Sequence, residues 1–153
     1  MSLVRSAVAV VLAALSASAV AESLEPVVVT ATRTGTPLSE VLASSIVVTR
    51  DQLDLFPATD VADVLRIQTG LEIARNGGPG QPASLFIRGT DSNHALVLLD
   101  GVRINPGTIG GAAFENIDPA SIERIEVIKG PQSAVWGTDA IGGVVNLITR
   151  RAT

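Results

Sequence analysis

Cysteine and tyrosine are absent from this chain of 153 residues, and its aromatic residues are three phenylalanines and one tryptophan. Without cysteine, disulfide bonds and thiolate metal sites are excluded. With so few aromatic rings, the hydrophobic core must be built mainly from aliphatic side chains. Hydrophobic residues still make up 46% of the chain, which is enough for one domain of ordinary size with its own core.

Charge is also scarce, because charged residues make up 17% of the chain and the formal net charge is −4. A protein that holds nucleic acid needs a basic surface for the phosphates. We therefore expect no nucleic acid partner.

The apolar runs are shorter than the roughly 20 residues that a membrane-spanning helix requires.

The amino-terminal segment has the three parts of a secretory signal. Arg5 supplies a positive start, Ala7–Leu15 is wholly apolar, and Ala19–Ala21 offers small residues around a cleavage site. A membrane anchor is the alternative, but the apolar stretch is too short to span a bilayer. The pattern predicts a signal peptide over residues 1–21 and export of the chain from Glu22 onward.

Helix signals are confined to the first half of the chain. Thr49 and Gln52 have the spacing of a capping box and predict a short helix. Asp60 is the expected cap of a second helix, which Gly70 is expected to stop. Three apolar residues of that second helix fall on one face by their i, i+3, i+4 spacing: Val61, Val64 and Leu65.

Strand signals dominate the second half. Asp100–Gly101 predicts a tight hairpin turn, and Asp118–Pro119 predicts a brief helical turn. Residues 124–128 alternate as a half-buried strand does, and residues 130–142 form a turn-rich bridge. Other apolar runs have strand length: 71–74, 85–87, 95–99 and 143–149. The mixed order, without regular strand and helix alternation, predicts a compact α+β domain.

Two glycine-rich stretches are the candidate binding loops, at 76–81 and 105–113. The first lacks the Lys-Ser/Thr ending of a P-loop and the spacing of a dinucleotide fingerprint, so nucleotide binding is rejected. His94 is the single histidine and lies near Ser92 and Asp100, but no nucleophile elbow accompanies it. We expect no enzyme activity and no cofactor.

Metal binding has no support in the sequence either. Four acidic or amide residues in the second half do not follow the spacing of a calcium loop: Asp91, Asn93, Asp100 and Asp118. We therefore predict no metal site.

The longest motif is IERIEVIKGPQSAVWGTDAIGGVVNLITR at residues 122–150, preceded by SLFIRGTDSNHALVLLDGVRIN at 84–105 and DVLR at 63–66. These motifs closely resemble the plug domain of TonB-dependent outer-membrane receptors. Three shorter segments are most similar to the cobalamin (vitamin B12) receptors of Gram-negative bacteria: VVVTATR, VVTRDQL and NGGPGQPASLFIRG. Siderophore receptors share the framework residues. The resemblance implies a compact plug domain over residues 38–150, with a small mixed β-sheet, short helices and long Gly-rich loops.

The resemblance also gives residues 22–37 a role, as a flexible segment that carries a TonB box. In such receptors the C-terminal domain of TonB captures this segment by strand addition, which relies on main-chain hydrogen bonds. From the residue pattern alone, the β-branched run could instead be the first strand of the domain's own sheet. The implied TonB box comprises Glu25, Pro26, Val27, Val28, Val29, Thr30 and Ala31.

Two further sets of residues match functional positions of the family. Asn76, Gln81, Ile109 and Gly110 stand where the receptors face cobalamin or a ferric siderophore, although these loops could also be solvated turns. Arg88 and Arg124 stand where plug arginines pair with glutamates of the outer-membrane barrel, although a solvated sheet face is the ordinary alternative.

Three residues follow the plug motif, so we expect no transmembrane barrel in this chain. Two explanations stay open. The chain is an interrupted piece of a receptor, or it is a free-standing periplasmic module with ligand-binding or signalling function. The first places it in the cell outer membrane as part of a full receptor, and the second places it in the periplasm.

Overall fold

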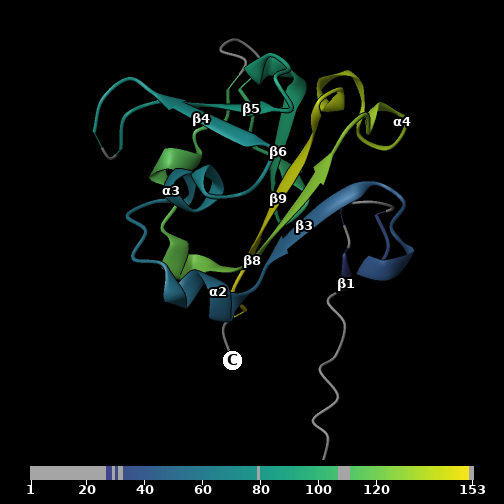
Figure 1. The fold of residues 1–153 in the computed structure, drawn as a ribbon, viewed down its shortest axis with the longest axis horizontal. Helices are drawn as coiled ribbons and strands as arrows, with labels where there is room; N and C mark the ends of the chain where they lie inside the picture. The colour runs from purple at the N-terminus through teal and green to yellow at the C-terminus, as the bar shows by residue number, and fades with distance from the viewer. Residues whose placement is uncertain (1–26, 29, 31–32, 79, 107–110, 152–153) are drawn as a thin grey trace, which may run out of the picture.

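The computed structural model describes residues 27–28, 30, 33–78, 80–106 and 111–151. The predicted signal peptide lies outside these residues. Short helices and three sheets make up the described part, the largest a mixed five-stranded sheet (Figure 1). The expected fold class is confirmed. Within the described ranges, no helix has the length and apolar character to cross a membrane.

The five-stranded sheet has the strand order β3-β8-β9-β6-β7. β6 runs parallel to β9, and the other neighbours are antiparallel, which makes the sheet mixed. The strand bounds are β3 (Ser44–Val48), β8 (Ile122–Lys129), β9 (Gly143–Thr149), β6 (Ala95–Leu99) and β7 (Val102–Arg103).

The predicted hairpin turn is confirmed between β6 and β7. Asp100 has φ of 51° and Gly101 has φ of 80°, so both central residues are left-handed, as a type I′ turn requires. Asp100 also accepts hydrogen bonds from the backbone N–H of Thr149 at 2.9 Å and from its hydroxyl at 2.6 Å. The turn therefore fixes the end of β9 as well as the hairpin.

The two predicted helices form as α2 (Arg50–Leu55) and α3 (Val61–Arg66). Gln52 Oε1 accepts the Thr49 N–H at 3.0 Å, and Asp60 Oδ1 accepts the Asp63 N–H at 3.1 Å, so both helix starts are capped by side chains. The expected end of α3 at Gly70 is wrong, since the helix ends at Arg66. Gly70, with φ of 80°, instead turns the chain into β4.

The main core lies on one face of the sheet. α2, α3 and the antiparallel pair β4 (Leu71–Arg75) and β5 (Ala83–Ile87) are on that side of the sheet in Figure 1. Phe114 is the one aromatic residue among the fully buried side chains there, so the core is mainly aliphatic, as the composition predicts. Its sheet-borne members include Ile125, Val127, Val145 and Leu147.

Short turns connect the larger elements. The predicted turn at Asp118–Pro119 is confirmed as η4 (Pro119–Ser121), where Asp118 Oδ1 accepts the Ala120 N–H at 2.8 Å. The bridge over 130–142 contains α4 (Ser133–Trp136) and η5 (Thr138–Ala140), which the turn-rich pattern did not predict. The remaining turns are η1 (Leu38–Glu40), η2 (Ser92–His94) and η3 (Phe114–Asn116).

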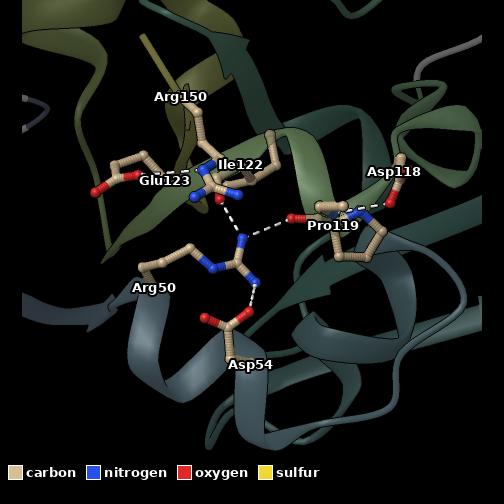
Figure 2. Close-up of polar contacts among 8 residues, drawn as sticks. Arg50, Asp54, Asp118, Pro119, Ile122, Glu123 and Arg150 are labelled. Atoms are coloured by element: carbon tan, nitrogen blue, oxygen red, sulfur yellow. Dashed lines mark hydrogen bonds and ion pairs between the residues drawn. The ribbon is translucent and has the colours of Figure 1, made fainter. Parts of the chain in front are cut away.

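Arg50 ties α2 to the start of β8 (Figure 2). One guanidinium nitrogen donates to the carbonyl oxygens of Pro119, at 2.9 Å, and Ile122, and the other pairs with Asp54 at 2.7 Å. Arg50 thereby fixes the entry of β8, the strand that carries Arg124.

Candidate functional site

β8 is buried on both faces, so its prediction as a half-buried strand is wrong. Glu126 and Ile128 have no exposed surface, and neither do Ile125 and Val127 on the other face. The physical reason is that the second face of the sheet is covered as well. α4, η5 and the segment around Thr30 lie over it.

Half of this second face is apolar. Leu96, Leu98 and Val144 project from β6 and β9 and pack against Ala140, with Trp136 at the margin. This small cluster explains why the sequence places an apolar segment in the bridge after β8. It holds Trp136 next to the polar half of the face.

The polar half is organised around Glu126. Its Oε2 accepts the backbone N–H of Thr30 at 2.9 Å and the Thr30 hydroxyl at 2.6 Å. Its Oε1 accepts Arg124 Nε at 2.9 Å. Hydrogen bonds to an ionised carboxylate are stronger than neutral ones, and a buried carboxylate requires them. Glu126 therefore binds the amino-terminal segment and Arg124 with its two oxygens.

Trp136 completes the contacts of Thr30. The indole Nε1 donates to the Thr30 carbonyl oxygen at 2.7 Å, and the Arg33 guanidinium carbon lies 4.4 Å from the indole ring centroid, in cation–π range. Thr30 is itself fully buried. We call the contacts of Thr30 with Glu126 and Trp136 the Thr30 anchor.

The start of the segment forms its own small sheet. β1 (Val27–Val28) pairs antiparallel with β2 (Thr36–Pro37), and Val28 is fully buried. A Cβ on Gly35 would lie 3.0 Å from Val27 Cγ1, so glycine permits this close approach. The β-branched run therefore supplies a strand, but β1 is not hydrogen-bonded into the five-stranded sheet. Glu25, Pro26, Val29 and Ala31 of the predicted TonB box lie outside the described residues.

A hollow of about 580 Å³ opens beside the anchor. Three arginines from distant parts of the chain line it, Arg33, Arg124 and Arg151. Asn146 and Gly101 lie in its wall, where Asn146 Oδ1 accepts the Gly101 N–H at 3.1 Å. The hollow gives water access to the surroundings of Thr30 and Arg124.

The two predicted barrel-contacting arginines have different surroundings. Arg124 is 31% exposed in its side chain and already has Glu126 as a carboxylate partner. Arg88 is exposed directly after β5, has φ of 53°, and its N–H donates to the Gly70 carbonyl at 3.2 Å. They line different hollows, so the structure does not bring them to one site. Their pairing with a barrel stays a prediction.

Of the predicted ligand-facing residues, the structure describes Asn76 and Gln81, while Ile109 and Gly110 lie outside the described residues. Asn76 and Gln81 are exposed in the connection between β4 and β5, and the Gln81 N–H donates to the Gly78 carbonyl at 3.2 Å. This connection lies at the upper left of Figure 1.

Sequence reasoning missed Glu126 and Trp136 as partners of the amino-terminal segment. They stand 96 and 106 residues from Thr30. The available signal was a charged residue within the apolar strand 125–128.

Comparison with known families gives a direct match. The model of the TonB-dependent Receptor Plug Domain matches residues 37–144, which is more than half of the chain.

Solved receptors share the fold. The siderophore receptor PirA from Acinetobacter baumannii is 32% identical with a TM-score of 0.56, over 71% of this chain and 17% of that one. FpvA from Pseudomonas aeruginosa, solved with heterologous pyoverdines, is 29% identical with a TM-score of 0.72, over 86% of this chain and 17% of that one. The ferric enterobactin receptor PfeA from Pseudomonas aeruginosa is 29% identical with a TM-score of 0.55, over 72% of this chain and 18% of that one.

This chain thus spans less than a fifth of the length of these receptors. The TonB-dependent receptors are transporters rather than enzymes. Since the family model covers the elements from η1 to the start of β9, this chain belongs to the TonB-dependent receptor plug domains.

Proposed function

We propose that this chain is the gating and ligand-sensing plug of a TonB-dependent outer-membrane transporter that takes up a ferric siderophore. The plug-family match over residues 37–144 carries this proposal. The solved relatives named above are siderophore receptors. This favours a siderophore as the ligand over cobalamin, which the sequence motifs favoured. In a full receptor, the plug would lie in the outer membrane with Arg88 and Arg124 toward the barrel.

The proposed TonB box is residues 25–31. Its β-branched residues favour an extended backbone, and Val27–Val28 are extended in the structure. Strand addition draws its affinity from main-chain N–H and C=O groups, so the box needs few specific side chains. The C-terminal domain of TonB is the proposed partner.

Val28→Pro should abolish capture by the C-terminal domain of TonB, because proline removes a donor of the added strand. A pull-down with that TonB domain measures the effect. Val102→Pro is the matched control, since Val102 is an exposed strand valine outside the box and should leave capture intact. Unchanged capture of Val28→Pro would contradict the TonB box.

The ligand class is tested by titrating the chain with a ferric catecholate siderophore and, separately, with cobalamin, followed by amide NMR. We expect siderophore-dependent shifts around Asn76 and Gln81, because exposed amide groups can hydrogen-bond the ligand. Asn76→Ala should reduce these shifts, while Asn93→Ala, at another exposed asparagine, should not. Shifts with cobalamin alone would reassign the ligand, and none with either would contradict the loop's role.

A further inference from the structure

The hollow of about 580 Å³ on the second face of the sheet combines arginines with apolar surface. We propose that it is a binding site for a small soluble molecule that carries a phosphate monoester. This inference goes beyond the proposed uptake of a siderophore and does not depend on it. The residues assigned to the phosphate are Arg33, Arg124 and Arg151, and those assigned to the organic part of the ligand are Trp136 and Ile148.

The positive charge of the hollow is not fully balanced by the chain itself. Arg124 pairs with Glu126 at 2.9 Å. Asp100 also lies in the wall, but both of its carboxylate oxygens already accept hydrogen bonds. Within the described ranges, Arg33 and Arg151 have no carboxylate partner. An anion is therefore attracted to the hollow.

The donors of the hollow come from separate segments. Arg33 precedes β2, Arg124 lies on β8, and Arg151 follows β9. Asn146 is 4% exposed and its Oδ1 accepts the Gly101 N–H, while the described residues supply no acceptor for its amide nitrogen. A carboxylate offers two oxygens in one plane, whereas a phosphate monoester offers three oxygens around a tetrahedral phosphorus. Donors from several segments therefore favour a phosphate.

Arg33 is held in place by its backbone and by an aromatic ring. Its φ of 60° lies in the left-handed region, which few residues other than glycine adopt. Its guanidinium carbon lies 4.4 Å from the ring centroid of Trp136, and a stacked guanidinium can still donate hydrogen bonds from its edge. Strained backbone angles gather at ligand-binding sites. Arg33 therefore has the features of a binding residue.

The size of the hollow indicates a ligand larger than a phosphate ion. Its volume of about 580 Å³ falls within the range of roughly 300–1,000 Å³ for small-molecule sites. Trp136 and Ile148 give its wall apolar surface. In the part of the chain that the structure describes, none of the exposed large apolar side chains lines the hollow, so nothing there favours insertion into a lipid surface. A soluble molecule therefore fits better than a lipid headgroup.

Phenyl phosphate is the probe, because it joins a phosphate monoester to a small apolar ring. Isothermal titration calorimetry measures its affinity for the chain at about pH 8, where a phosphate monoester carries about two negative charges. Benzoate, at the same ionic strength, carries a carboxylate on the same ring. We expect phenyl phosphate to bind at least about tenfold more tightly than benzoate. It should also change the fluorescence of Trp136, the single tryptophan.

Arg33→Gln and Arg151→Gln test the site without disturbing the core, because both residues are exposed. Each should weaken the binding of phenyl phosphate about tenfold, since each removes a charge-assisted hydrogen bond. Arg66→Gln is the matched control. It removes the same charge from an exposed arginine of α3 outside the hollow, and it should leave the affinity unchanged. Arg33→Lys keeps the charge without the planar group, so it should retain part of the affinity.

Four results would overturn the proposal. The first is that phenyl phosphate does not bind or leaves the fluorescence of Trp136 unchanged. The second is that Arg66→Gln weakens binding as much as Arg33→Gln does, which would show a general effect of charge. The third is that benzoate binds as tightly as phenyl phosphate. The fourth is that vesicles of phosphatidylcholine with phosphatidic acid capture the chain while phenyl phosphate does not bind, which would assign the hollow to a lipid headgroup.

Discussion

Gly143→Ala should unfold the domain. A Cβ at this position would lie 2.4 Å from the Ile128 carbonyl oxygen and 3.0 Å from Ile87 Cδ1, and the backbone has φ of +155°. Gly143 cannot move aside easily, because its β-sheet partners are Lys129 on β8 and Ala95 on β6. We expect a loss of more than about 4 kcal/mol, a large part of the stability of a domain of this size.

Urea denaturation followed by circular dichroism measures this loss, with soluble yield as a second readout. Gly78→Ala is the matched control, because a Cβ there meets no atom within 4 Å and φ is not in the left-handed region. The control should change the free energy of unfolding by less than about 0.5 kcal/mol. A Gly143→Ala domain within about 1 kcal/mol of the wild type would contradict the steric argument.

Arg75→Met should cost about 3–5 kcal/mol of stability, because it strands a buried carboxylate. Arg75 Nη2 contacts both carboxylate oxygens of Asp60, at 2.7 and 2.8 Å, and the two side chains are 6% and 4% exposed. Asp60 also caps α3 through the Asp63 N–H, so a displaced carboxylate would disturb the helix start. The free energy of unfolding in urea measures the loss.

Arg150→Met is the matched control for this prediction. Arg150 and Glu123 are 58% and 49% exposed with 3.9 Å between their charged atoms, so their pairing contributes between about 0 and 1 kcal/mol. Asp60→Asn in the Arg75→Met background should recover part of the stability, because it removes the stranded charge. Equal losses in the free energy of unfolding for Arg75→Met and Arg150→Met would show that burial does not determine how much an ion pair stabilises this domain.

Local features of the fold could be predicted from the sequence. The cap between Thr49 and Gln52, the cap at Asp60 and the turn at Asp100–Gly101 each depend on residues a few positions apart. Strand length and type follow from short apolar runs, which is why β6 and β9 begin and end where the sequence indicates.

Contacts between distant segments could not be predicted. Thr30 meets Glu126 across 96 residues, and Arg50 meets Ile122 across 72, because the sheet topology brings these segments together. The alternation of apolar and polar residues in β8 predicted one solvent-exposed face, yet Thr30 of the amino-terminal segment covers Glu126 on that face. The end of α3 was misplaced because Gly70 acts in the turn to β4 rather than at the helix end.

The edge position of β3 determines how a mechanical load enters the domain. Within the described residues, β3 has a hydrogen-bonded neighbour on one side only, β8, while β8, β9 and β6 each have neighbours on both sides. A pull on Val27 passes through the Thr30 anchor and β2 before it reaches β3. Once those contacts part, the β3–β8 ladder is the next hydrogen-bonded contact along the chain that the tension meets.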